Sequence, residues 1–181
     1  MKKAAALAFA LLTVPAPLLI GTVPARGDDA MTAAANAFYL ATARASSGGG
    51  IPGAAVRARL QPLLTPGLNK LLADAAGAEA RFNAKNKDSP PLIEGDIFSS
   101  LFEGPTAFKV GVCRGDDKIA HCGVTLTHQD PGQKPVTWVD TLTLINSGGW
   151  KIDDIAYDAN FAFGNTGTLN EMLKMTLHEA P

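Results

Sequence analysis

The clearest pattern in the chain is the alternation of apolar and polar residues in its C-terminal half. Runs rich in β-branched and aromatic residues are separated there by clusters of Gly, Asn, Asp and Pro. Such runs, joined by turn-forming residues, are typical of β-hairpins. The pattern predicts an antiparallel meander of three or four strands, in the segments Thr106–Cys113, Ile119–His128, Val136–Ile145 and Trp150–Tyr157.

Apolar residues at helical spacing mark the first half of the chain. The spacing predicts helices at Asp28–Arg44, Pro52–Leu64 and Pro66 to about Asn86. Thr65 is the expected N-cap of the third helix, and the spacing of Thr168 and Glu171 is that of a capping box before a short C-terminal helix. Because the helices and strands are segregated along the chain, the fold class is predicted as α+β, with the N-terminal helices packed on the sheet.

Two aromatic-rich segments frame the predicted sheet. Pro91–Pro105 is interpreted as a strand stub followed by a loop that supports the sheet, and Asp158–Gly167 as a second aromatic loop. In the first predicted strand, Phe108, Val110 and Val112 alternate toward the helices.

The N-terminus has the three parts of a secretory signal peptide. Lys2 and Lys3 are followed by the apolar segment Ala4–Ile20 and by small residues, with cleavage expected before Arg26 or before Asp28. The alternative is an uncleaved membrane anchor, against which the interrupting prolines count. A leader over residues 1–25 leaves a single domain over residues 28–176, in the periplasm or secreted.

The net charge of the chain after removal of the leader argues against some classes of partner. Removing Lys2 and Lys3 with the leader leaves 14 basic and 17 acidic residues, a net charge of −3. This balance argues against nucleic acid or anionic lipid as a partner, and after cleavage no membrane attachment is expected. The expected partner is an unknown small ligand or a periplasmic protein, with a homodimer through the sheet as a further option. No cofactor is expected.

The two cysteines, Cys113 and Cys122, flank the first hairpin turn. An even number of cysteines in an exported chain favours a disulfide. The alternative is a metal site with His121, which lacks a fourth ligand nearby. Strict alternation puts Cys113 on the face opposite Phe108. The bridge therefore requires a bulge at Gly111 or Gly115, or a sheet that is buried on both faces.

Several of these segments resemble a family of exported bacterial proteins of unknown function in the nuclear-transport-factor-2-like (cystatin-like) superfamily. The resemblance lies in Pro91–Phe98, the strands, Trp150–Ile155 and the helix start at Gly167, and it covers about Ala30 to Met175. It implies a curved, cone-like sheet. Related exported domains include immunity proteins that neutralise toxins, and the superfamily includes acid/base enzymes, but none of their catalytic sets maps onto this chain.

Few residues are candidates for chemistry. Asp140 shares a predicted strand face with Trp138 and Leu142, where an unpaired carboxylate is costly, and Asp96 is a candidate partner for it in an acid/base pair. For both, a structural role in a hydrogen-bonded strand or turn is the favoured alternative. The candidate residues for binding a ligand or partner are Trp138, Asp140, Tyr157, Phe161 and Phe163.

The function predicted from the sequence is a non-catalytic periplasmic binding domain for a small ligand or a protein. One alternative is an immunity or inhibitor protein against a secreted toxin. The other is an enzyme that uses Asp140 in the cavity of the cone.

Overall fold

The computed structural model describes residues 27–43 and 49–179. The predicted leader lies outside these residues. The helices of the first half are α1 (Gly27–Ala43), α2 (Ala54–Leu60), the 3-10 helix η1 (Gln61–Leu63) and α3 (Pro66–Lys85). The strands are β1 (Ala107–Gly115), β2 (Ile119–His128), β3 (Val136–Asn146) and β4 (Trp150–Ala156), and the C-terminal helix is α4 (Leu169–Glu179).

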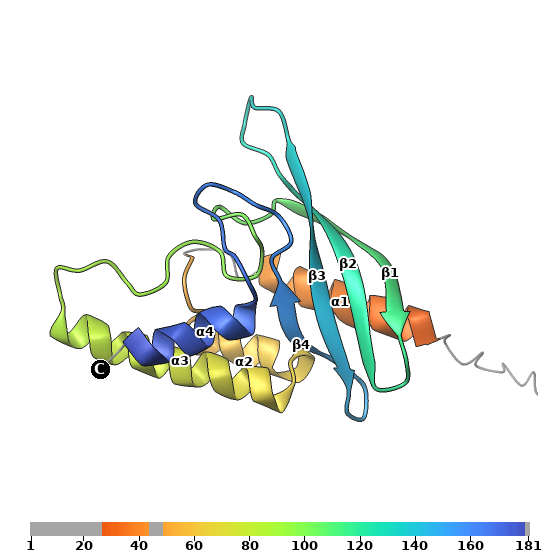
Figure 1. Cartoon of the computed structure of the whole chain (residues 1–181), viewed down its shortest axis with the longest axis horizontal. Helices are drawn as coiled ribbons and strands as arrows, with labels where there is room; N and C mark the ends of the chain where they lie inside the picture. The colour runs from red at the N-terminus through yellow and green to blue at the C-terminus, as the bar shows by residue number, and fades with distance from the viewer. Residues whose placement is uncertain (1–26, 44–48, 180–181) are drawn as a thin grey trace, which may run out of the picture.

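The four strands form one antiparallel sheet in the order β1-β2-β3-β4. Helix α1 crosses one face of this sheet and contacts both edge strands, while α3 and α4 pack against each other beside β4 (Figure 1). The predicted α+β class, the meander and the closing helix are therefore confirmed. The sheet twists but is not strongly curled (Figure 1).

The core lies between α1 and the sheet. Inward-facing residues on the two central strands are fully buried, and they pack against the aromatic pair Phe38 and Tyr39 of α1. The strand residues of this layer are Ala120, Cys122, Val124, Leu126, Leu142 and Leu144. The opposite face of the sheet is partly exposed, as period-two alternation requires.

The free edge of β4 is covered by other parts of the chain. Leu64 forms a parallel bridge with Ile152, and Thr168 forms an antiparallel bridge with Ala156. Both contacts adjoin helix starts whose predicted caps are present. Thr65 Oγ1 accepts from the Leu68 backbone N–H at 3.2 Å, and the N–H of Glu171 donates to Thr168 Oγ1 at 3.2 Å.

A bulge in β1 resolves the parity problem of the disulfide. Val110 pairs with Val124 and Cys113 pairs with Cys122, so Gly111 and Val112 together lie opposite a single residue. Beyond the bulge the facing reverses, which buries Cys113 and leaves Val112 70% exposed. The predicted bulge at Gly111 is confirmed, and the prediction that Val112 faces the helices is wrong for the same reason.

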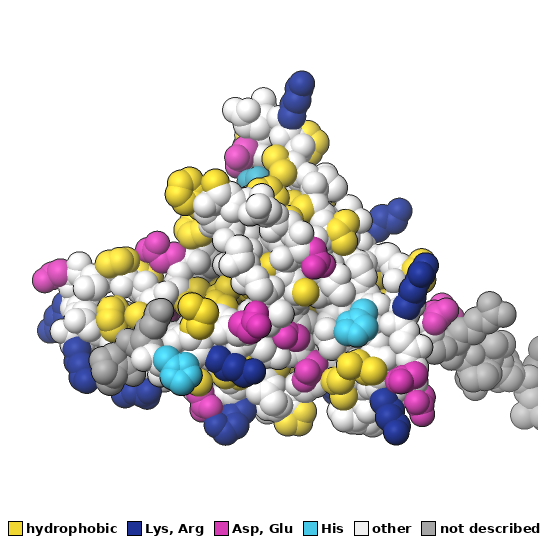
Figure 2. All heavy atoms as spheres, viewed as in Figure 1, with side chains coloured by type: hydrophobic (Ala, Val, Ile, Leu, Met, Phe, Trp, Pro, Cys, Tyr) yellow, Lys and Arg dark blue, Asp and Glu magenta, His cyan; other side chains and the backbone are white. Residues whose placement is uncertain are grey.

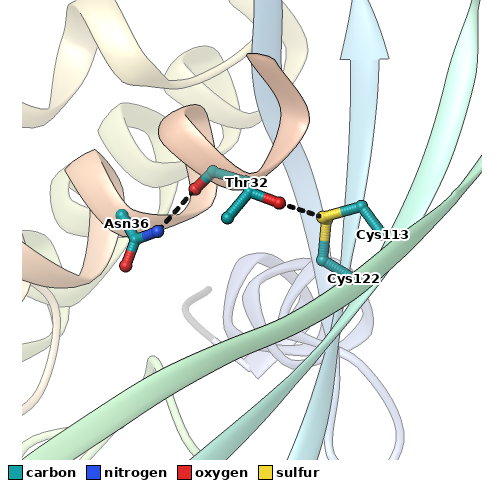
Figure 3. The surroundings of a disulfide bond; sticks show 4 residues. All are labelled: Thr32, Asn36, Cys113 and Cys122. Carbon is teal, nitrogen blue, oxygen red and sulfur yellow. Dashed lines mark hydrogen bonds between the residues drawn. A yellow bond between two sulfur atoms is a disulfide. The ribbon is translucent and has the colours of Figure 1, made fainter. Parts of the chain in front are cut away.

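The predicted disulfide joins Cys113 to Cys122 across the β1–β2 hairpin. The Cα atoms are 4.1 Å apart, and the sulfurs lie under α1, where Thr32 Oγ1 is 3.7 Å from Cys113 Sγ (Figure 3). Asn36 holds the same helix turn by donating to the Thr32 carbonyl at 2.8 Å (Figure 3). Because each sulfur is bonded to the other, the alternative of a zinc site is not realised. A disulfide is consistent with an oxidising compartment.

Candidate functional site

A fully buried carboxylate lies at the centre of the inner sheet face. Asp140 on β3 is 0% exposed and accepts four hydrogen bonds. Its Oδ2 accepts from the backbone N–H of Ser100 at 2.7 Å and from Trp138 Nε1 at 3.0 Å. Its Oδ1 accepts from the hydroxyl of Ser100 and from the backbone N–H of Asp158 at 3.2 Å. Donors therefore surround both oxygens, which compensates the cost of burying the charge.

These bonds tie two distant loops to the sheet. Ser100 belongs to the segment between α3 and β1, and Asp158 belongs to the segment between β4 and α4. The two segments also contact each other, because Asn165 Nδ2 donates to the carbonyls of Asp96 and Ser99, both at 2.7 Å. Residues 91–105 include no strand, so the predicted strand stub is wrong and the supporting loop is confirmed.

Asp96 lies in a tight turn of the same loop. Its backbone N–H donates to the Phe102 carbonyl at 2.7 Å, and its Oδ1 accepts from the Phe98 N–H at 2.8 Å. Gly104 has a φ of 73°, and a Cβ there would lie 2.9 Å from the Asp96 Cβ, so the turn requires glycine.

The acidity of Asp96 is reduced by its surroundings. Burial raises the pKa of this carboxyl from 3.8 to about 6. Hydrogen bonds from the Phe98 backbone and from Ser99 act to lower the pKa, whereas the nearby charge of Asp140 acts to raise it. The two acidic candidates thus interact electrostatically, but only Asp96 lines a cavity among the pockets of the described residues.

Two buried tyrosines complete the polar part of the core. Tyr157 donates its hydroxyl to the Ile97 carbonyl at 2.7 Å, and Tyr39 donates to the Phe98 carbonyl at 3.2 Å. Burial raises the pKa of both phenols, with the charges of Asp96 and Asp140 contributing. Both hydroxyls therefore stay protonated at neutral pH and act as donors that hold the loop.

A cavity of about 290 Å³ opens beside Asp96. It lies between the end of α1, the Asp96 loop and the start of β1, and we call it the Asp96 cavity. Its walls are mainly apolar and aromatic, with Tyr39 and Phe108 stacked at 5.3 Å between ring centroids. The lining residues are Tyr39, Thr42, Ala43, Asp96, Phe98, Pro105, Thr106, Ala107 and Phe108.

A second, wider cavity of about 560 Å³ lies on the other side of the Asp96 loop. Its acidic lining residues are Glu79, Glu94, Asp96 and Glu103. Asp96 thus contributes to both cavities, and no Lys, Arg or His is among the described residues that line either of them.

The residues that were predicted from the sequence to bind a ligand or partner differ in their burial and contacts. Trp138 is buried, donates to Asp140 and meets Phe161 edge to face at 5.5 Å between centroids. Tyr157 is also buried, whereas Phe163 is 90% exposed. Figure 2 shows hydrophobic side chains gathered at the surface where the loop after β4 and the loop before β1 lie.

Sequence reasoning missed the aromatic walls of the Asp96 cavity. Tyr39 was expected only as part of a helix, Phe98 as part of a loop, and Phe108 as a core residue of β1. Their separations of 59 residues between Tyr39 and Phe98, and 69 between Tyr39 and Phe108, gave no local signal that they meet. The one local signal was Asp96, which follows Gly95 and lies two residues before Phe98.

No protein-family model, curated protein or solved structure matches the chain. The site is therefore interpreted from its own geometry. Within residues 27–43 and 49–179, none of the helices combines the length and the apolarity needed to cross a lipid bilayer. In the same residues, no three His, Cys, Asp or Glu side chains are grouped so that they could hold a metal ion.

Proposed function

We propose that this protein is an exported, non-catalytic binding domain that takes a small ligand in the Asp96 cavity. The observation that carries the proposal is the cavity itself: aromatic walls around a single carboxyl group. Ligand pockets are mostly apolar, with a few polar groups that fix orientation. The Asp96 loop is held by hydrogen bonds from Asn165 and Phe98, so the cavity is largely preformed.

Non-catalytic binding is favoured over acid/base catalysis by the state of Asp140. Four donors occupy its two oxygens, so it has little capacity to accept a proton from a substrate. If the protein is an enzyme, its general base is Asp96, whose pKa of about 6 suits proton transfer near neutral pH. Turnover of a ligand that binds in the cavity would favour this second function.

A protein partner is the other candidate, and Phe163 is the observation that favours it. A 90% exposed aromatic side chain on a braced loop is the kind of residue that anchors protein interfaces. This alternative includes an immunity or inhibitor protein against a secreted toxin. Loss of a periplasmic partner from pull-downs with Phe163→Ser, but not with Met175→Ser at another exposed hydrophobic residue, would support it.

The nuclear-transport-factor-2-like fold and export are parts of the same proposal. Helices ahead of an antiparallel meander support that fold, whereas the modest curl of the sheet departs from a cone (Figure 1).

The disulfide supports export. The intact mass of the exported protein tests the cleavage, with a cut before Arg26 or Asp28 expected. Light scattering tests the predicted homodimer through the sheet.

Ligand-observed NMR with a panel of small cations, neutral molecules and anions tests the binding function. We expect at least one member to bind, and we expect Ala43→Trp at the cavity to abolish that binding. Ala84→Trp, an exposed position on α3, is the matched control and should bind as the wild type does. If no member of the panel binds, or if both variants bind equally well, the cavity is not the ligand site.

A further inference from the structure

We infer that the ligand of the Asp96 cavity is a small organic cation, held by the aromatic rings and by the Asp96 carboxylate. This inference rests on the proposed binding function and deepens it by naming the chemical class of the ligand. It is carried by three features of the cavity, which are its aromatic walls, the sign of its charges and its size.

The walls have the composition of an aromatic cage. Tyr39, Phe98 and Phe108 line the cavity together. Tyr39 is fixed by its bond to the Phe98 carbonyl and by stacking on Phe108, so these rings are held in place before a ligand arrives. Ring faces carry negative potential and attract alkylated ammonium groups.

The described residues that line the cavity carry charge of one sign. Asp96 is its ionisable carboxylic acid, and no Lys, Arg or His is among the described residues that line it. Thr42 and Ala43, the last described residues of α1, both line the cavity.

The Asp96 carboxylate has fewer hydrogen-bond donors than Asp140. It accepts bonds from the Phe98 N–H and from Ser99, and no Lys, Arg or His is among the described residues that line the cavities on either side of the loop. Burying such a charge is costly, and an ammonium group placed against it would offset that cost. An anionic ligand would face the same charge, with no basic side chain among the described lining residues to balance it.

The size of the cavity limits the ligand. A volume of about 290 Å³ lies at the lower end of the range for small-molecule pockets. It accommodates a compact alkylammonium group with a short chain and excludes large cofactors. The apolar walls at Phe98 and Pro105 favour a methylated ammonium over a hydrated inorganic cation, which would have to shed its water.

Calorimetric titration with three probes of one shape tests the inference. Choline is the cation, dimethylbutanol is the neutral isostere in which carbon replaces nitrogen, and dimethylbutanoate is the matching anion. At neutral pH we expect choline to bind at least about tenfold more tightly than dimethylbutanol, with no binding of dimethylbutanoate. If dimethylbutanol binds as tightly as choline, or dimethylbutanoate binds best, the cation inference is wrong while the binding function stands. If none of the three binds, the cation inference is also wrong, and the wider panel then decides the binding function.

Variants locate the interaction. Asp96→Asn keeps an oxygen for the Phe98 N–H and should weaken choline binding about tenfold or more, with little effect on dimethylbutanol. Glu103→Gln removes the same charge from the neighbouring cavity and should leave choline binding within about twofold. Phe108→Leu should weaken choline about two- to thirtyfold. Equal effects of Asp96→Asn and Glu103→Gln would overturn the assignment, and circular dichroism shows whether each variant is folded.

Discussion

Asp140 and Asp96 show how neighbouring carboxyl groups acquire different roles. Asp140 is enclosed by four donors and connects the sheet with two loops. Asp96 has fewer donors, lies at a cavity and has a raised pKa. Donors occupy both oxygens of the first group, while burial raises the pKa of the second. The first is therefore suited to holding the fold, and the second to meeting a ligand.

Replacing Asp140 by Asn should destabilise the protein. One of its oxygens becomes an amide that donates, and this amide faces two donors that it cannot satisfy. We expect the free energy of unfolding in urea to fall by about 2–4 kcal/mol. Asp158→Asn is the control, because its backbone N–H still reaches Asp140, and it should cost about 0.5 kcal/mol or less. Equal effects of the two substitutions would show that the network around Asp140 is unimportant.

Asp96 should make stability depend on pH in the direction opposite to most carboxyl groups. Its pKa is raised to about 6 on folding, so between pH 4 and 6 the folded state binds more protons than the unfolded state. The contribution of Asp96 to the free energy of unfolding is fully present at low pH and is lost as pH rises through about 6. We expect Asp96→Asn to be more stable than the wild type at pH 7, by up to about 3 kcal/mol, and the difference to vanish near pH 4. Urea unfolding at both pH values measures this, and an unchanged difference would contradict the raised pKa.

At the scale of elements, the disulfide is expected to hold the β1–β2 hairpin beneath α1. Its loop spans 9 residues in sequence separation, for which the chain-entropy model gives roughly 2–3 kcal/mol. Cys113→Ala combined with Cys122→Ala should therefore lower the free energy of unfolding by about that amount. A reducing agent should destabilise the wild type similarly and leave the double variant unaffected. If the wild type keeps its free energy of unfolding after both cysteines are fully reduced, the disulfide does not have this role.

The regular elements could be predicted because their signals are local. Alternation located β2 and β3 to within a residue of their observed bounds, and Thr65 and Thr168 cap the helices that their neighbours indicated. The bulge followed from combining that alternation with the requirement that Cys113 reach Cys122. In each case the residues that decide the structure are close in sequence, or are linked by a bond that the chain must form.

The Asp96 loop could not be predicted because its partners are far away in sequence. Ser100 bonds to Asp140, 40 residues on, and Asn165 bonds to Asp96, at a separation of 69 residues. Periodicity carries no information about such contacts. Its polar and aromatic residues fit a strand or a loop equally well until the donors around Asp140 are known. The cavity that this loop forms with α1 was hidden for the same reason.

For the whole molecule, acidic groups lie on both sides of the Asp96 loop. Asp140 lies near Asp96 within the core, and Glu79, Glu94 and Glu103 line the cavity on the other side of the loop. The charge of Asp140 opposes ionisation of Asp96. A bound cation would instead favour ionisation of Asp96. Ligand binding, proton release and folding should therefore be coupled.

This coupling predicts that choline stabilises the whole protein in a pH-dependent manner. A cation binds the ionised form of Asp96, so below pH 6 binding must first remove a proton, and the affinity should fall about tenfold between pH 7 and pH 5. At pH 7, choline at about 100 times its Kd should raise the free energy of unfolding by about 2.7 kcal/mol. The same choline concentration at pH 5 should give a clearly smaller rise in Tm. In Asp96→Asn the remaining small effect of choline should be the same at both pH values, because the group that titrates is gone. An equal stabilisation of the wild type at pH 5 and pH 7 would show that the bound cation does not meet the Asp96 carboxylate.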